Sequence, residues 1–217
     1  MAESSDSGPS TSTAPAAGTP SSPEPSRADR QRSRVLAVAA EIFSRRGFRA
    51  TSMNEIAAAV GLSKPTLYHY FHSKEELLVR LYSDVLDESL RMAREVVGAA
   101  PTPLAGVREL ISSRVAYTCR NQALLKVCFE EEHELPAELA EQLLRRRHAF
   151  EELVVATLEE HLAAHPAVEL GMPSKVWVNM CLGAANWTYK WFRPSGPDDP
   201  ERLGERIAAA LTAGITP

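Results

Sequence analysis

The stretch Thr51-Ser-Met-Asn-Glu-Ile-Ala-Ala-Ala-Val-Gly-Leu-Ser-Lys-Pro-Thr-Leu-Tyr-His-Tyr-Phe-His-Ser-Lys74 predicts two short helices joined by a tight turn. Ser52 opens a Ser-x-x-Glu capping box, which marks the start of the first helix. Gly61 supplies the left-handed residue that ends it. Ser63 is placed to cap the second helix, and Pro65 falls in its first turn, where a missing N–H costs nothing.

The remaining residues of this stretch divide into an inner and an outer face. Met53, Ile56 and Val60 recur at helical spacing in the first helix, and Leu67 and Phe71 do so in the second. The polar and aromatic side chains left on the outer surface of the second helix are Lys64, Thr66, Tyr68, His69 and Tyr70. A crossed helix pair with donors on the outer face of its second helix is the layout of a DNA-reading helix-turn-helix.

The charge distribution supports this interpretation although the whole chain is acidic. Its 217 residues carry a formal net charge of -4, with a pI near 5.9. Residues 27–74 nevertheless hold nine Lys and Arg residues against three acidic ones. A basic head on an acidic body suits a phosphate-binding domain attached to a domain that does not bind phosphate.

Composition and patterning predict an all-α protein in three parts. Residues 1–26 contain 22 Pro, Ser, Thr, Ala and Gly residues and are expected to be a disordered tail. Residues 27–74 are expected to form the helix-turn-helix domain, which begins with a helix over 27–46. A long helix from Ser73-Lys74 to about Val97 would bridge into a body at 75–217, where no strand alternation is found. The further predicted helices span 104–120, 122–132, 136–164, 173–192 and 199–213.

The cysteines and the hydropathy indicate the compartment. Cys119, Cys128 and Cys181 are odd in number and widely spaced, which favours a reducing cytoplasm over a disulfide framework. The sequence contains neither a run of eighteen apolar residues nor an N-terminal pattern of basic and hydrophobic regions. We therefore expect a cytoplasmic protein without a membrane partner.

These motifs together resemble the TetR family of bacterial repressors. The resemblance rests on Thr51-Ser52, Ile56-Ala57, Val60-Gly61, the run Ser63–Phe71 and the following Ser-Lys-Glu, and it covers roughly residues 30–80. It implies a homodimer that binds a palindromic DNA operator and is released when a small molecule enters the helical body. The bridging helix that starts at Lys74 would then move and change the separation of the two recognition helices.

The resemblance and the chemistry assign the same DNA contacts. Base reading is expected from Lys64, Thr66 and His69, with apolar contacts from Pro65 to thymine methyl groups. The whole predicted set is Ser52, Lys64, Pro65, Thr66, Tyr68, His69, Tyr70 and Lys74, most of which would hold phosphates and fix the register. Three of them have a second interpretation: Ser52 as a cap, Tyr70 as a packing residue and Lys74 as a solvated charge.

A second informative stretch runs from Trp177 to Gly196. Helical geometry places Trp177, Met180, Ala184, Trp187 and Trp191 on one face, with Asn186 and Lys190 beside it. This aromatic face could line a cavity. It could equally be a dimer interface, since Gly183, Ala184 and Ala185 allow close helix approach.

The segment 186–196, Asn-Trp-Thr-Tyr-Lys-Trp-Phe-Arg-Pro-Ser-Gly, looks like that of TetR-type repressors that respond to acyl-CoA thioesters in actinobacterial sterol and fatty-acid catabolism. An acyl-CoA site needs an apolar cavity with cations at its mouth. The residues expected to bind it are Trp187 and Trp191 for the acyl group, and Arg146, Arg147, Lys190 and Arg193 for the phosphates. The arginines in the run 145–148 could instead form a solvated face with nearby glutamates.

No pattern indicates catalysis, a cofactor or a metal. The histidines do not have metal-ligand spacing, and we find neither a phosphate loop nor a nucleophile elbow. The leading hypothesis is an acyl-CoA-responsive repressor. Its alternatives are a repressor of an efflux or antibiotic gene that responds to a neutral aromatic compound, an acyl-CoA-processing enzyme fused to a DNA-binding head, and a ligand-independent DNA-organising protein.

Overall fold

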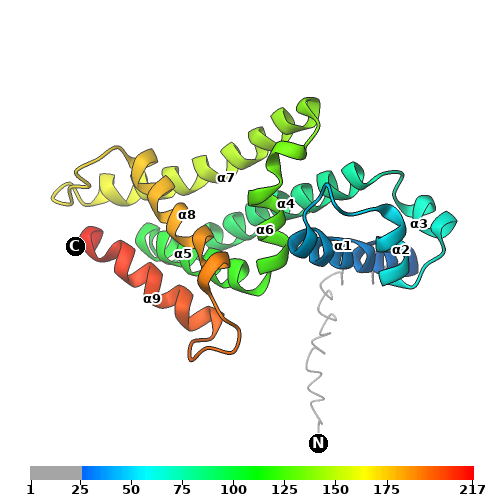
Figure 1. Cartoon of the computed structure of the whole chain (residues 1–217). Coiled ribbons are helices and arrows are strands. Elements are labelled where there is room, and N and C mark those ends of the chain that lie inside the picture. The colour runs from blue at the N-terminus through cyan, green and yellow to red at the C-terminus, as the bar shows by residue number, and fades with distance from the viewer. Residues whose placement is uncertain (1–25) are drawn as a thin grey trace, which may run out of the picture.

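The computed structural model describes residues 26–217, and these form helices and connecting loops without any strand (Figure 1). The disordered tail expected at residues 1–26 lies, apart from Ser26, outside the described residues. The α-helices are α1 (Arg27–Arg46), α2 (Met53–Val60), α3 (Lys64–Tyr70), α4 (Lys74–Ala99), α5 (Pro103–Arg120), α6 (Gln122–Glu130), α7 (Ala137–Ala164), α8 (Ser174–Trp191) and α9 (Pro200–Thr212). Two short 3-10 helices, η1 (Glu132–Glu134) and η2 (Ala213–Ile215), follow α6 and α9.

Local capping explains where the headpiece helices begin and end. Ser52 accepts the backbone N–H of Glu55, whose carboxylate returns to the Ser52 backbone N–H at 2.8 Å. Gly61 ends α2 in the left-handed conformation, with φ of 75°, and Ser63 caps α3. Hydrogen bonds to Ser52 lower the pKa of Glu55. All three predicted stop and start signals are therefore present.

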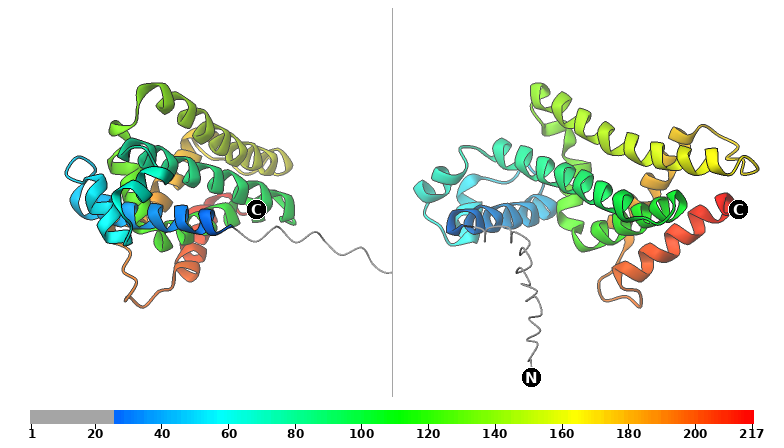
Figure 2. Two further views of the ribbon diagram at one scale, coloured as in Figure 1. Left: turned by 90° about the vertical axis from the view of Figure 1, so that its right-hand side faces the viewer. Right: turned by 180° about the vertical axis from the view of Figure 1, so that it is seen from behind.

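The headpiece of α1–α3 lies at one end of the elongated molecule, and α4 runs from it into the body (Figures 1 and 2). In the body α4 packs against α5 and α7, while α5 lies between α4, α7, α8 and α9. The α5–α9 contact needs Gly204, because a Cβ there would lie 2.4 Å from the Ser112 carbonyl oxygen. The helix α8 also packs against α5 and makes a smaller contact with α9.

The headpiece core does not stop at the headpiece. One apolar cluster joins Phe43 and Leu67 of the headpiece to Leu78 of α4, Leu125 of α6 and Leu143 of α7. A second cluster fills the far end of the body between α4, α5, α7, α8 and α9. Because α6 and the start of α7 share a core with α1, a displacement of these elements is transmitted to the headpiece.

The predicted helices match the observed ones closely. The helix at 27–46 has the predicted bounds, and the bridging helix runs to Ala99 rather than to Val97. The helix predicted at 122–132 ends at Glu130, after which the chain tightens into η1. Within the described part of the chain, no helix is long and apolar enough to cross a membrane.

Candidate functional site

The outer face of α3 presents the predicted base-reading residues to solvent. Lys64, Pro65, Thr66 and His69 are exposed, and Tyr68 is 37% exposed, while Leu67 is fully buried beneath them. The Lys64 ammonium lies 5.8 Å from the centre of the Tyr68 ring. The helix therefore offers a mixed row of cationic, hydroxyl and aromatic groups on a rigid base.

Two members of the predicted set are partly engaged within the headpiece. The Thr66 hydroxyl shares a 2.7 Å hydrogen bond with Ser63, whose side chain also accepts the Thr66 N–H. Tyr70 is half-buried against the headpiece core, with its ring edge-on to His69 at 5.5 Å and the Arg32 guanidinium 5.8 Å from its centre. The packing alternative for Tyr70 thus agrees with its surroundings.

An open groove of about 450 Å³ brings together four of the predicted residues from three helices. Ser52 lies at the start of α2, Lys64 and Tyr68 on α3, and Lys74 at the start of α4. Asn54 and His72 also line this groove. Sequence reasoning did not select these two, although both lie in the same motif and are exposed.

Lys74 differs from its predicted role. Its ammonium donates to the carbonyl oxygens of Phe48, Arg49 and Thr51 at 2.9, 3.3 and 3.2 Å, and it lies 4.4 Å from the centre of the Phe48 ring. An ammonium has three donors, so all of them are committed to the turn between α1 and α2. The ammonium thus forms an internal staple that joins α4 to this turn, whereas the prediction placed it free at a phosphate.

A cavity of about 330 Å³ occupies the body between α4, α5, α6, α7 and α8. Its apolar wall includes Val85, Leu86 and Leu182 and the rings of Phe129 and Phe150. The other lining residues are Tyr82, Ser89, Arg114, Cys128, Glu132, Arg147, Glu151, Asn179, Gly183 and Asn186. An apolar wall with a few convergent polar groups is typical of a small-molecule site.

The polar groups of the cavity come mainly from residues that sequence reasoning missed. The Arg114 guanidinium donates to Asn186 Oδ1 at 2.7 Å and to Ser89 Oγ at 2.8 Å. Burial lowers the pKa of Arg114 and raises the pKa of the Cys128 thiol to about 12, so that Cys128 stays protonated near neutral pH. Arg114 is one of three arginines in the helix predicted at 104–120, so the sequence did not single it out.

The aromatic face of α8 does not line this cavity, and neither Trp187 nor Trp191 is among its lining residues. The two side chains are 59% and 48% exposed, and they continue an outward stripe with Val176 and Met180. The helix buries its other side through residues such as Cys181 and Ala185. Trp177, predicted on the same face, is instead 5% exposed and packs in the body core, so helical periodicity grouped Met180, Trp187 and Trp191 correctly but not Trp177.

The expected cations are also distributed differently. Arg147 lines the cavity and pairs with Glu132 at 3.3 Å and Glu151 at 3.8 Å. Arg146 points away from it and contacts Asp87 at 3.2 Å. Lys190 forms an ion pair with Glu130, which raises the pKa of Lys190, and Arg193 is exposed beyond the end of α8. Of the six predicted ligand-binding residues, the structure places only Arg147 at the cavity.

The segment from α6 to η1 connects the cavity to the headpiece. Glu131 Oε1 accepts the Phe48 backbone N–H at 3.1 Å, and Glu134 pairs with the Arg49 side chain. Lys126 donates to the Ser44 carbonyl oxygen at 2.6 Å. Phe129 and Glu132, in the same segment, line the cavity. Along residues 126–134, side chains that line the cavity thus alternate with side chains that contact the headpiece.

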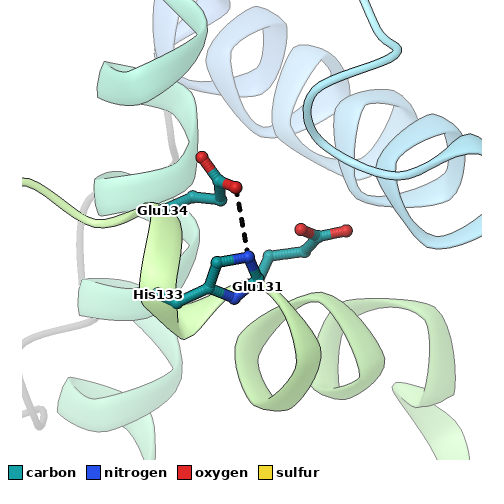
Figure 3. A group of neighbouring side chains, drawn as sticks. All are labelled: Glu131, His133 and Glu134. Carbon is teal, nitrogen blue, oxygen red and sulfur yellow. Dashed lines mark ion pairs between the residues drawn. The ribbon is translucent and has the colours of Figure 1, made fainter.

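Three side chains of this junction gather closely enough to share a cation (Figure 3). The ligand atoms of Glu131, His133 and Glu134 lie within 4.8 Å of one another, and His133 Nε2 lies 3.1 Å from Glu134. Both carboxylates already accept hydrogen bonds from the Phe48–Arg49 turn. Their arrangement is thus explained by the contact between headpiece and body.

The helix-turn-helix headpiece, joined through a long helix to an all-helical body with a cavity, defines a helix-turn-helix transcriptional regulator. Family models agree: residues 35–81 match "Bacterial regulatory proteins, tetR family", and residues 100–215 match "Tetracyclin repressor-like, C-terminal domain". The second match alone covers more than half of the chain. The chain therefore belongs to the TetR family, as its sequence motifs predicted.

Relatives of known role and known structure extend this assignment. The repressor KstR2 of Mycobacterium tuberculosis is 25% identical over 192 residues, 86% of this chain and 93% of its own. The activator FasR of Mycolicibacterium smegmatis is 27% identical over 161 residues, 70% and 74% of the two chains. The structure resembles PfmR of Thermus thermophilus with a TM-score of 0.75 at 26% identity, covering 85% of this chain and all of that one.

Two further structural likenesses carry lower identity. KstR2 of Mycobacterium tuberculosis aligns with a TM-score of 0.78 at 24% identity, over 86% and 95% of the two chains. AibR, solved with isovaleryl coenzyme A and operator DNA, aligns with a TM-score of 0.70 at 24% identity, over 83% and 97%. At such identity these likenesses establish the fold alone. The named sequence relatives are transcriptional regulators, which confirms the prediction that this chain is not an enzyme.

Proposed function

We propose that this protein is a homodimeric transcriptional repressor that leaves a palindromic operator when an acyl-CoA thioester enters the body. The observation that carries the proposal is the junction of α6 and η1. Phe129 and Glu132 in this segment line the cavity, whereas Glu131 and Glu134 hold the turn that precedes the DNA-reading helices. A ligand that displaces the first pair must strain the second.

The DNA-binding part of the proposal rests on the exposed face of α3. Lys64, Thr66 and His69 face solvent for base edges, Pro65 for thymine methyl groups, and Tyr68 for phosphates. Ser52 stays in the set as a residue of the neighbouring groove, and Tyr70 as one that supports α3. The two recognition helices of a dimer must lie about 34–36 Å apart to enter successive major grooves.

The part of the proposal that concerns the dimer rests on the outward stripe of α8. Val176, Met180, Trp187 and Trp191 are exposed at helical spacing, and the small residues Gly183 and Ala184 lie between them. A self-complementary stripe of this kind fits a two-fold axis, where each copy presents the same surface. The exposure of the aromatic face therefore favours its second interpretation, as an interface between copies.

The part of the proposal that concerns the effector draws on the cavity and on the related regulators. The cavity combines apolar side chains with Arg114, and the fold is shared with AibR, whose structure contains isovaleryl coenzyme A. KstR2 is described as a ketosteroid regulator. In this proposal the acyl group binds against the apolar side chains of the cavity, and the coenzyme part extends outward.

Binding assays on the full-length protein test the proposal. Operator fragments are selected from a random DNA pool, and their affinity is measured by fluorescence anisotropy with and without a panel of straight-chain and cyclic acyl-CoA thioesters. We expect at least one thioester to weaken operator binding tenfold or more and to raise the thermal midpoint. Neutral aromatic compounds are tested in the same assay. Release by these compounds alone would favour the efflux-type alternative, and unchanged affinity with every compound would refute ligand control.

A further inference from the structure

The wall of the cavity includes a residue with a buried polar atom that none of the described residues satisfies. Among the described residues, three buried side-chain nitrogen or oxygen atoms lack a hydrogen-bond partner: Gln31 Nε2, Tyr82 Oη and His161 Nδ1. Of these, only Tyr82 lines the cavity, and its side chain is 7% exposed. Buried hydroxyl groups nearly always have a partner, so a free one at a cavity wall points to a bound molecule.

A cationic group without an anionic partner lines the same cavity. Arg114 is held by neutral oxygens, those of Asn186 and Ser89, and by the rings of Tyr117 and Phe150, each 6.0 Å from its Cζ atom. No carboxylate of residues 26–217 forms an ion pair with it. The hydrogen bonds fix the orientation of the guanidinium but leave its charge uncompensated.

The acidic residues of the cavity are committed elsewhere. Glu132 and Glu151 both pair with Arg147 rather than with Arg114. The Tyr82 hydroxyl is a donor, and the guanidinium has only donors, so together they favour a group that accepts hydrogen bonds and carries negative charge. A carboxylate meets both conditions and can bind a guanidinium through both oxygens.

We propose, within the effector site proposed above, that Tyr82 and Arg114 recognise a carboxylate on an otherwise apolar ligand. The carboxylate belongs either to a free acid or to the far end of an acyl thioester that carries a second carboxyl group. A volume of about 330 Å³ is at the lower end of ligand sites, so the cavity fits an acyl body of medium length rather than a whole coenzyme.

Calorimetric titration of the full-length protein with two matched pairs of probes tests this inference. The first pair is octanoate and octanamide, and the second is octanedioyl mono-CoA and octanoyl-CoA. We expect the carboxylate member of at least one pair to bind about tenfold or more tightly than its neutral partner, as a charge-assisted hydrogen bond allows. The pair that shows the preference identifies the source of the carboxylate.

Three variants locate the preference. Tyr82→Phe removes an oxygen that makes no internal hydrogen bond, so it should keep the thermal midpoint and reduce the preference about tenfold. Arg114→Gln keeps a side chain that can bond to Asn186 and Ser89, and it should abolish the preference. Tyr117→Phe is the matched control, because Tyr117 lies beside Arg114 without lining this cavity, and it should keep the preference of the unmodified protein.

The outcomes separate this inference from the proposed function. Thioesters that bind with no carboxylate preference, or a preference that survives both Tyr82→Phe and Arg114→Gln, would overturn the carboxylate site and leave acyl-CoA control standing. A preference shown by free acids alone, with no thioester binding, would support the site and overturn acyl-CoA as the effector. If none of the four probes binds, the carboxylate site is refuted together with the thioester effector.

Discussion

Replacing Lys74 by methionine distinguishes a structural lysine from a phosphate-binding one. The substitution keeps most of the aliphatic stem and removes the ammonium that donates to three carbonyl oxygens at 2.9–3.3 Å. Hydrogen bonds that involve a charged group contribute about 1.5–3 kcal/mol each when buried. Because this site is only half-buried and water can reach the freed carbonyls, we expect a loss of about 2 kcal/mol in the free energy of unfolding.

Two measurements follow from that value. In a domain of this size a loss of about 2 kcal/mol lowers the thermal midpoint by roughly 4–8 °C. Calorimetry or urea unfolding should record this loss in the absence of DNA. Operator binding should weaken as the turn between α1 and α2 loosens, but the slope of log affinity against log salt should stay unchanged, because no phosphate contact is removed.

Lys64→Met provides the matched control. Lys64 is exposed on α3 and makes no hydrogen bond within the described structure, so its loss should leave the thermal midpoint unchanged. It should reduce the salt slope by about 0.9 if the ammonium meets one phosphate. A Lys74→Met variant of unaltered stability with a reduced salt slope would refute the internal staple and restore the phosphate contact.

Three further predictions concern the dimer, the junction and the buried thiol. A two-fold interface contains Trp187 twice, so Trp187→Glu should raise the dimer dissociation constant, measured by analytical ultracentrifugation, by about a hundredfold or more. A variant that remains dimeric at micromolar concentration would place the interface elsewhere. Glu131→Gln weakens the acceptor of the Phe48 N–H, so it should reduce the ligand-induced loss of operator affinity while ligand affinity, measured without DNA, stays within about twofold; a full response would exclude this contact from the switch. Burial raises the pKa of Cys128 from 9.0 to about 12, so the neutral thiol stabilises the fold below pH 9 and this contribution is lost as the pH rises from 9 to 12. A Cys128→Ala variant should therefore show a smaller fall in thermal midpoint than the unmodified protein over that range. Equal falls in the two proteins would contradict the assignment.

Features that depend on neighbouring residues were predictable from the sequence. Ser52, Gly61 and Ser63 act through backbone groups within four positions, so their pattern fixes where α2 and α3 begin and end. The apolar spacing likewise placed Leu67 inward and left Lys64 outward. These are local geometric consequences of a helix, and no tertiary contact reverses them.

Features that depend on distant contacts were not predictable in this way. Trp187 and Lys190 were assigned to a cavity because aromatic and cationic groups lie side by side on α8, yet the core covers the opposite side of that helix. Lys74 is bound to carbonyl oxygens more than twenty residues away in the chain. Tyr82 and Arg114 lie on different helices, and only the packing of α4 against α5 brings both to one cavity.

The turn at residues 47–51 is the point where two routes from the body converge. The expected movement of the bridging helix that starts at Lys74 describes only one of them, because Lys74 binds the turn from α4 while Glu131 and Glu134 bind it from the α6–η1 segment. A rigid shift of the whole body would move both anchors together and leave the turn undistorted. We therefore infer that a ligand acts by changing the separation of α4 and α6, whose side chains Tyr82 and Phe129 both line the cavity. Since interfaces of packed helices respond by switching between discrete arrangements, such a change would tilt the headpiece rather than soften it.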